Sequence, residues 1–384
     1  MNVYLDNSAT TRPFETVVEA MNKSMLEGFY NPSALYAPAM YAERGMADAR
    51  KVIAATLKAN EKNVIFTSGG TESDNLAIWG WLQTQRVPGE VLYTAAEHAA
   101  VKNACLEAER RFGCKAREIP LLSNGSIDLA ALEEMLNEHT QLICVMQVCN
   151  ETGVIMPIKE VCALRDKLAP KAAIHVDGVQ GYLRVPFSFQ QYKVQSYALS
   201  AHKIHGPKGV GALVIRDGHR IKPQMAGGGQ QNDLRSGTEN TCGIAGLMEA
   251  IRQYPADGMS RMLAMKQLLA AMLAEKLPEM QIVGLPVDDA MSAGHILNVA
   301  FPPVRAETLL HALEMDNICV GTGSACSSKK GKHSTVLTAM GCSFQVMEGA
   351  IRISLSPCNT EEEMRYTAEK MIEKVGMLRK FTRR

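Results

Sequence analysis

The chain has 384 residues, of which 46% are hydrophobic, and it carries a formal net charge of +1. This length is enough for two domains with well-filled cores, and the balanced charge gives no indication of a nucleic-acid partner or of binding to an acidic membrane surface. There is no bilayer-spanning apolar run, no signal-peptide pattern at the N-terminus and no Cys-x-x-Cys pair among the ten cysteines, so we expect a cytoplasmic protein without a metal site or disulfide framework.

Residues 3–215 alternate short apolar runs with helical patterns. After a short strand and a polar turn in residues 3–10, the pattern predicts strands over 64–67, 91–94, 114–119, 142–148, 172–177, 194–199 and 210–215, and helices over 14–27, 40–58, 75–82, 99–111, 129–137 and 158–168. Such alternation is typical of an α/β fold with a doubly wound, mostly parallel sheet.

A glycine-rich turn, residues 68–72, joins the strand at 64–67 to the helix that follows. Free backbone N–H groups at the positive end of a helix dipole suit a phosphate, so Gly70 and Thr71 are candidate phosphate ligands. A plain helix start with Thr71 as its cap is the alternative interpretation. No Gly-Lys-Ser/Thr sequence follows, so the turn does not imply ATP.

Four polar residues each come after a predicted strand: His98, Asn150, Asp177 and Lys203. In doubly wound sheets, ligands bind beyond the carboxyl ends of the strands. We therefore expect these four residues to converge on one site. For His98 taken alone, a role as a helix cap is the favoured explanation.

Lys203 lies in the stretch Ser200-Ala-His-Lys-Ile-His-Gly-Pro-Lys-Gly209, between two apolar runs. Gly206, Pro207 and Gly209 predict a tight turn rather than a helix. A lysine fixed there tends to lose water and its proton, which makes it a usable amine nucleophile. The alternative is a surface hairpin with solvated lysines.

Asp177 ends the predicted strand at 172–177, where it could face Lys203 across a bound ring. Pyridoxal phosphate (PLP) needs such a pair, a lysine for the Schiff base and a carboxylate that keeps the pyridine nitrogen protonated. A loop-capping aspartate is the alternative role for Asp177.

The second half of the chain changes character near residues 254–258. Before it come a glycine-rich loop at 225–238, whose Ser, Thr and Arg side chains could reach an anion, and a helix over 239–254. After it an α+β pattern predicts helices over 259–276, 306–314 and 360–378 and strands over 295–301 and 350–355. We therefore expect a large domain over 13–257 and a small domain made of 1–12 and 258–384.

Two residues of the small domain are candidates for chemistry. Cys326 lies among small and polar residues, 321–333, expected to be mobile, and three lysines follow it within six positions, which favours the reactive thiolate. Arg352 stands in an otherwise apolar strand, so it needs a carboxylate partner, either a structural glutamate or a substrate.

Taken together, these residues resemble the class I, NifS/IscS-type cysteine desulfurases, PLP enzymes of fold type I within the class-V aminotransferase family. The resemblance covers nearly the whole chain, and its specific stretches are residues 4–11, 66–77, 97–98, 150–151, 175–177, 200–203, 235–238 and 323–326. Ala201, His205, Cys149 and Tyr36 depart from the common pattern without removing a catalytic group.

The resemblance implies a role for each candidate residue. Lys203 would hold PLP and later move the Cα proton, Asp177 would pair with the pyridinium nitrogen, and Cys326 would take the substrate sulfur as a persulfide. The other implied contacts are His98 stacked on the ring and assisting proton transfer, Gln180 at the ring hydroxyl, Gly70, Thr71, Ser200 and His202 at the phosphate with Thr238 from the other subunit of a homodimer, and Asn150 and Arg352 at the substrate carboxylate.

The resemblance thus implies a homodimer that converts L-cysteine to L-alanine and passes sulfur to an acceptor protein, such as an iron–sulfur scaffold or a tRNA-thiolation enzyme. Another fold type I PLP lyase or transaminase, such as a selenocysteine lyase, is the alternative, and it would not need Cys326. A sulfur-trafficking scaffold that turns over poorly alone is the rival from outside the lyases.

Overall fold

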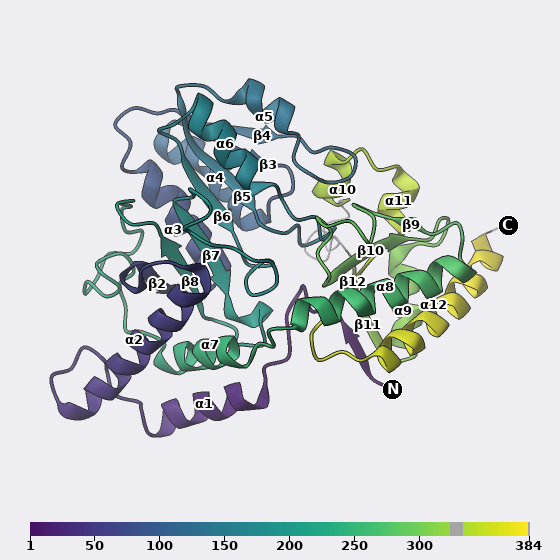
Figure 1. Cartoon of the computed structure of the whole chain (residues 1–384), viewed down its shortest axis with the longest axis horizontal. Helices are drawn as coiled ribbons and strands as arrows, with labels where there is room; N and C mark the ends of the chain where they lie inside the picture. The colour runs from purple at the N-terminus through teal and green to yellow at the C-terminus, as the bar shows by residue number, and fades with distance from the viewer. Residues whose placement is uncertain (323–332, 383–384) are drawn as a thin grey trace.

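The computed structural model describes residues 1–322 and 333–382, and two β-sheets organise these residues into two lobes (Figure 1). The larger sheet has the strand order β2 (Val64–Thr67), β8 (Gly211–Ile215), β7 (Ser196–Ser200), β6 (Ala173–Asp177), β5 (Thr140–Met146), β3 (Glu90–Thr94) and β4 (Lys115–Ile119). Strand β8 is antiparallel to both neighbours, and the strands from β7 to β4 are parallel. The predicted α/β fold with a mostly parallel sheet is confirmed.

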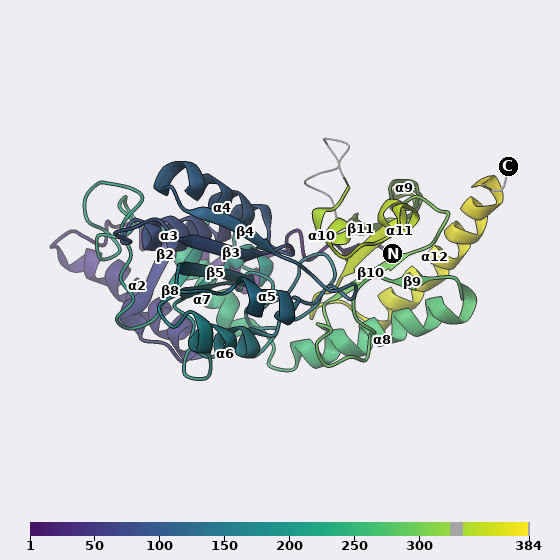
Figure 2. The same cartoon turned by 90° about the horizontal axis from the view of Figure 1, so that it is seen from above.

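Helices cover both faces of this sheet, with α4 on one side and α6 on the other (Figure 2). The helices of this lobe are α1 (Glu15–Leu26), α2 (Ala37–Leu57), α3 (Gly70–Leu82), α4 (Ala99–Phe112), α5 (Leu129–Met135), α6 (Ile158–Leu168) and α7 (Thr241–Gln253). None of the described helices combines the length and apolar character that crossing a membrane would require.

The second lobe contains both ends of the chain (Figure 1). Its sheet has the order β1 (Val3–Leu5), β11 (Ile318–Thr322), β12 (Ala350–Ser354), β10 (Ile296–Ala300) and β9 (Gln281–Ile282). The helices are α8 (Gly258–Lys276), α9 (Ala306–Glu314), α10 (Thr335–Ala339), α11 (Phe344–Gly349) and α12 (Glu361–Thr382). Because β1 pairs in parallel with β11, the first residues of the chain belong to the sheet formed by its last third.

Several local predictions were wrong or incomplete. Strand β11 and the short helices α10 and α11 were missed, and Gly321 and Thr322 belong to β11 rather than to a loop. Thr71 does not cap α3, because Gly69 with φ +149° turns the chain into the helix and Gly70 is its first residue. The Glu72 carboxylate accepts a hydrogen bond from the Ser68 N–H at 2.8 Å and so stabilises this start instead.

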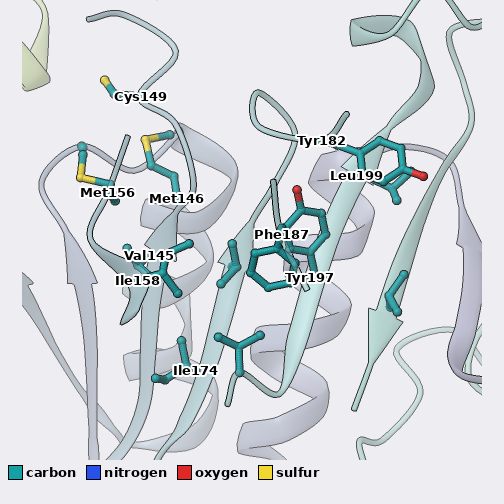
Figure 3. Close-up of a cluster of buried hydrophobic side chains, with 14 of the residues drawn as sticks. Val145, Met146, Cys149, Met156, Ile158, Ile174, Tyr182, Phe187, Tyr197 and Leu199 are labelled. Atoms are coloured by element: carbon teal, nitrogen blue, oxygen red, sulfur yellow. The ribbon is translucent and has the colours of Figure 1, made fainter. Parts of the chain in front are cut away.

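An aromatic cluster beneath the larger sheet fixes the strands that end at Asp177 and near Lys203 (Figure 3). The Tyr197 and Phe187 rings lie 4.5 Å apart, and the Tyr197 hydroxyl donates to Gln147 Oε1 at 2.6 Å. A Cβ on Gly178 would lie 1.9 Å from Tyr197 Cζ, so only glycine fits directly after Asp177. Packing beneath the sheet therefore fixes the backbone on which Asp177 sits.

Residues 6–11, here called the N-terminal strap, cross from the smaller sheet to the loop that carries Lys203. Asn7 Nδ2 donates to the Ser354 carbonyl of β12, and the Thr11 N–H donates to the His202 carbonyl, both at 2.9 Å. The sequence pattern predicted only a polar turn here. The strap therefore connects the two lobes through hydrogen bonds to residues far along the chain, one near its middle and one near its end.

Candidate active site

Lys203 ends a single 3-10 turn, Ala201–Lys203, directly after β7. Its Nζ donates to the carbonyls of Ser8 and Ala9 in the N-terminal strap, at 2.6 and 2.9 Å. Burial, together with the guanidinium groups of Arg352 and Arg184, lowers the pKa of Lys203 to about 8, against the opposing effect of Asp177 and Asp6. Roughly a tenth of this amine is therefore uncharged at pH 7 and can act as a nucleophile.

His205 follows two residues later and fastens this loop to both lobes. It has φ +66°, its ring stacks on Phe14 at 4.4 Å, and its Nδ1 and Nε2 lie 2.8 and 3.0 Å from the Arg12 carbonyl and Ser356 Oγ. Since Nδ1 must carry the proton to bond a carbonyl, Nε2 accepts from the serine hydroxyl. This departure from the family pattern is therefore accommodated by specific contacts.

Asp177 is the last residue of β6 and is 6% exposed. Its Oδ1 accepts from the Val179 N–H at 2.9 Å, so the loop-capping role holds as well, and it uses only one carboxylate oxygen. Burial raises the pKa of Asp177, while His98 and Lys203 act in the opposite direction. Among the described residues no cation lies within ion-pair distance of Asp177, so a cationic ligand group would be a favourable counter-ion.

His98 caps α4, and its Nδ1 accepts from the Ala100 N–H at 3.2 Å. The alternative role as a helix cap is therefore correct, and it leaves the proton of the neutral ring on Nε2. Although the residue is exposed, loss of water to the surrounding protein lowers the pKa of His98, against the pull of Asp177. The electrostatic interaction of His98 with both Asp177 and Lys203 indicates that the three groups lie near one another.

The candidate phosphate ligands come from two neighbouring parts of the larger sheet. A Cβ on Gly69 would lie 3.6 Å from Ser200 Oγ, and a Cβ on Gly70 would lie 2.7 Å from Val179 Cγ2, so the glycine turn closely approaches the end of β7 and the loop after Asp177. Thr71 is exposed in the first turn of α3, and His202 Nδ1 lies 3.2 Å from Thr10 Oγ1. Helix α3 thus begins beside Ser200 with an arrangement that suits an anion.

Gln180 and Arg184 form a buried layer beside Lys203. Gln180 Nε2 donates to the Ser8 carbonyl at 2.9 Å, and Arg184 Nη1 donates to Gln180 Oε1 at 3.3 Å. Arg184 Nη2 also donates to the Lys203 carbonyl. The sequence indicated Gln180 but not Arg184, which is 3% exposed and orients both the amide of Gln180 and the backbone of Lys203.

Arg352, in the middle of β12, reaches this site from the smaller sheet. Its Nη1 donates to the Asn150 carbonyl at 3.0 Å and its Nη2 to Asp6 Oδ1 at 2.8 Å. The predicted neighbours Asn150 and Arg352 therefore meet. The carboxylate partner that Arg352 needed is Asp6 of the N-terminal strap rather than a glutamate.

Two buried acids beneath the site, Glu97 and Asp74, were missed. Glu97 Oε1 accepts from Thr94 Oγ1 and from the Met146 N–H, both at 2.7 Å, while Asp74 Oδ1 lies 3.1 Å from His175 Nε2. Burial, with the Asp177 charge, raises the pKa of Glu97 to about 8 and that of Asp74 well above its usual range. Both acids lie within stretches that carry the resemblance, 66–77 and 97–98, and only their burial, which the sequence pattern does not report, distinguishes them.

Two predicted site residues do not join this cluster. Thr238 is exposed on the loop before α7, and the prediction that places it in a partner subunit's site stays a prediction. Cys326 and the lysines that follow it lie outside the described residues.

The residues present fit PLP. They provide a half-buried lysine with a lowered pKa, a buried carboxylate without a described cationic partner, an anion-binding helix start at Gly70 and a histidine beside the acid. These groups come from four strand ends of one sheet, which is where such folds bind ligands.

The comparisons with known proteins agree with this assignment. The model of the family "Aminotransferase class-V" matches residues 3–366. The chain is 37% identical to cysteine desulfurase 2 of Trichormus variabilis over 98% of this chain and 92% of that protein, and 36% identical to the cysteine desulfurase IscS of Methanosarcina thermophila over 98% and 93%. A solved NifS-like protein superposes with a TM-score of 0.91 at 34% identity, covering 98% of this chain and 100% of that one. Members of this family use PLP, and this chain belongs to the class-V aminotransferase family.

Proposed function

We propose that this protein is a PLP-dependent cysteine desulfurase that converts L-cysteine to L-alanine and transfers the sulfur to its own Cys326. One observation carries the proposal: Lys203, which would hold the cofactor, and Arg352, which would bind a carboxylate, both bond to the N-terminal strap, within residues 6–9. A cofactor held at Lys203 would react with an amine, and Arg352 would bind a carboxylate. The two positions together therefore suit an α-amino acid. The names of the relatives supply cysteine as that amino acid.

Each residue of the site has a part in this reaction. Arg352 and Asn150 would bind and orient the substrate carboxylate, and Lys203, released from the cofactor, would move the proton at Cα. When bound, PLP supplies an electron sink for the carbanion at Cα, and Asp177 would favour this by keeping the ring nitrogen protonated. His98, with its proton on Nε2, would stack on the ring and assist proton transfer.

Cys326 would complete the sulfur step. Its thiolate attacks the substrate sulfur, the bond from that sulfur to Cβ breaks, and the electron pair left on carbon takes up a proton to give alanine. One cysteine and one enzyme thiol become one alanine and one enzyme persulfide, so no external oxidant or reductant is needed. The lysines at 329, 330 and 332 would favour the thiolate.

The test is incubation of the purified protein with L-cysteine, followed by mass spectrometry of each cysteine and measurement of alanine. We expect one extra sulfur on Cys326 and its loss, together with most alanine formation, in Cys326→Ser. Cys319→Ser and Cys358→Ser are matched controls, because both cysteines are exposed yet lie outside the candidate site. Alanine formation that survives Cys326→Ser, with the persulfide on another cysteine, would instead indicate a general PLP lyase such as a selenocysteine lyase.

The resemblance to the class I, NifS/IscS-type enzymes also suggests a homodimer. The segment that joins α1 to α2 lies at the edge of the larger lobe (Figure 1). Together with the adjoining ends of the two helices, it exposes large apolar side chains, each more than half accessible: Leu26, Phe29, Leu35, Tyr36 and Tyr41. A second copy that covers these side chains is the partner we propose, and Thr238 would then serve the partner's phosphate site.

The remaining assignments follow from the same proposal. Residues 13–257 would form the large domain, and 1–12 with 258–384 the small one. Free cysteines are compatible with a reducing cytoplasm, and the persulfide would pass to an acceptor protein in iron–sulfur cluster assembly or tRNA thiolation.

A further inference from the structure

Arg352 already has an anionic partner within the chain. Its side chain is 5% exposed and pairs with Asp6, which is 23% exposed, at 2.8 Å between Nη2 and Oδ1. The Asn150 carbonyl takes Nη1 at 3.0 Å, and Nε is buried without a hydrogen-bond partner among the described residues. The pair is therefore largely shielded from water. In such a place the attraction between opposite charges is stronger than at the surface.

The fold makes room for this pair at one position. Gly321 of β11 is the register partner of Arg352 on β12, and a Cβ there would lie 2.5 Å from Asp6 Oδ1 and 3.0 Å from Arg352 Nη2. Asp6 itself is held by an isolated parallel bridge to Ser354. Three strands of the smaller lobe thus place one carboxylate against the guanidinium, and the missing side chain of Gly321 gives it space.

We propose that Asp6 is a built-in competitor that occupies Arg352 in the absence of substrate and weakens the binding of the substrate's carboxylate. The inference rests on the proposed function, because it takes Arg352 as the receptor for the α-carboxylate. It adds a determinant of affinity that lies outside the residues which touch the cofactor.

The charges around Arg352 show in which direction removal of the Asp6 charge should change the binding of a carboxylate. Arg184 and Lys203 bring further positive charge to the site, and Asp6 is the acid that bonds directly to the arginine. Without the Asp6 charge, an incoming carboxylate would meet an arginine whose charge is not compensated, in a buried place. The same removal would slow the departure of alanine, since no internal carboxylate would replace it.

The experiment compares two ligands that differ only in the carboxylate, L-alanine and L-alaninamide, on the PLP-loaded enzyme and its Asp6→Asn variant. Binding is followed by the absorbance change of the enzyme-bound cofactor. We expect the dissociation constant for L-alanine to fall roughly tenfold in the variant, the size of effect that one charged neighbour commonly has on an ionic equilibrium. The constant for L-alaninamide should change less than twofold, and both kcat and KM for L-cysteine should fall.

Asp316→Asn is the matched control. Asp316 pairs with Lys374 at 2.8 Å just before β11 begins, at the opposite end of the strand from Gly321. The Asp316→Asn variant loses the same charge from the same lobe and should leave the dissociation constants of both ligands unchanged. Asp6→Ser lacks both the charge and the side-chain amide that Asp6→Asn retains. It should shift the dissociation constant for L-alanine in the same direction as Asp6→Asn.

The inference is overturned if both Asp6 variants retain the cofactor but bind L-alanine no more tightly than the unmodified enzyme, or if both ligands shift together. Binding of L-alanine does not require a sulfur step. An enzyme that forms no alanine from L-cysteine would therefore refute the proposed function while the comparison of L-alanine with L-alaninamide still decides the role of Asp6.

Discussion

Two lysines in the described part of the chain are held away from water, one in each lobe, and they differ in what surrounds them. Burial lowers the pKa of Lys203 and of Lys266 alike, to about 8 in each case. Lys266, on α8, is 2% exposed, and its Nζ donates to Ser292 Oγ at 2.7 Å and to the Ala293 carbonyl at 3.0 Å. Burial is its only resolved influence, whereas two arginines and two aspartates act on Lys203.

The difference teaches what a lowered pKa does and does not indicate. Lys266 sits against the apolar core of the smaller lobe, where its amine is satisfied by neutral acceptors and has no ion-pair partner among the described residues. Lys203 sits where several strand ends and the N-terminal strap converge, near Asp177 and Arg352. The meeting of charged groups from separate elements, rather than the pKa alone, identifies the site.

Replacing the two lysines gives the largest expected contrast. Lys203→Ala removes the amine that would hold PLP, so alanine formation should fall by about a thousandfold or more. Borohydride reduction fixes a lysine-bound cofactor permanently to the chain, and in this variant the reduction should leave no such label. Lys266→Ala should keep the label and most of the activity, and a label that persists in Lys203→Ala would assign the attachment to another lysine.

Asp177→Asn removes the acid that only one of the two lysines faces. The variant should still bind PLP but lose orders of magnitude in turnover, because each ~1.4 kcal/mol of lost transition-state stabilisation is tenfold in rate. Cofactor content and alanine formation are measured on the same preparation. Near-normal turnover in a cofactor-loaded variant would show that another group keeps the ring nitrogen protonated.

The half of the site on the larger sheet could be predicted from the sequence. Asp177 and Lys203 end apolar runs whose period and β-branched residues predict strands, and His98 and Asn150 follow similar runs. Parallel strands then bring such residues to one edge. For these four positions local pattern and topology were sufficient, and the strand predictions for β2, β3, β6 and β8 agree with the structure to within one residue at each end.

The contribution of the N-terminal strap could not be predicted in this way. Ser8 and Ala9 contact Lys203, and Asp6 contacts Arg352, across at least half the length of the chain. Two of these contacts use backbone carbonyls, which any residue supplies. Strand β11 was missed for a local reason, since its short apolar run leads directly into a glycine-rich stretch. Burial of Glu97 depends on the packing of β5 against β3, which no local pattern reports.

Lys266→Met should change the pH dependence of stability rather than activity. The pKa of Lys266 is about 8 in the folded chain and near 10.5 when unfolded, so between these values the unfolded chain holds the extra proton and the free energy of unfolding rises with pH. Methionine removes this slope and the cost of burying the charge, which is ~3 kcal/mol at pH values below 8 for a shift of this size. The change in the urea unfolding midpoint between pH 7.5 and pH 9.5 would measure this difference. An equal change in both proteins would contradict the lowered pKa of Lys266.

Glu97→Gln should have the smallest effect on activity. Like Asp177→Asn, it replaces a buried carboxyl group by an amide, and Glu97 directly precedes His98. Burial raises the pKa of Glu97 to about 8, so its carboxyl is mostly neutral at pH 7, and the amide of glutamine imitates it. The glutamine oxygen can still accept from Thr94 Oγ1 and the Met146 N–H, the two bonds that hold β3 against β5 just before His98. Activity at pH 7 should therefore stay within about threefold, a change worth less than ~1 kcal/mol.

The stability of this variant gives the sign test for Glu97. In the unmodified chain the folded state keeps the proton between pH 4.5 and 8 while the unfolded state releases it, so the contribution of Glu97 is fully present below pH 4.5 and is lost as the pH rises through about 8. The glutamine variant lacks this decline and should gain relative stability as the pH rises, measured by urea unfolding at pH 5 and pH 8.5. Glu97→Ala, which loses both hydrogen bonds, should be less stable at every pH. A large loss of activity in Glu97→Gln at pH 7 would show that Glu97 acts as a charged group, the role we propose for Asp177, and would place a second working acid beneath the site.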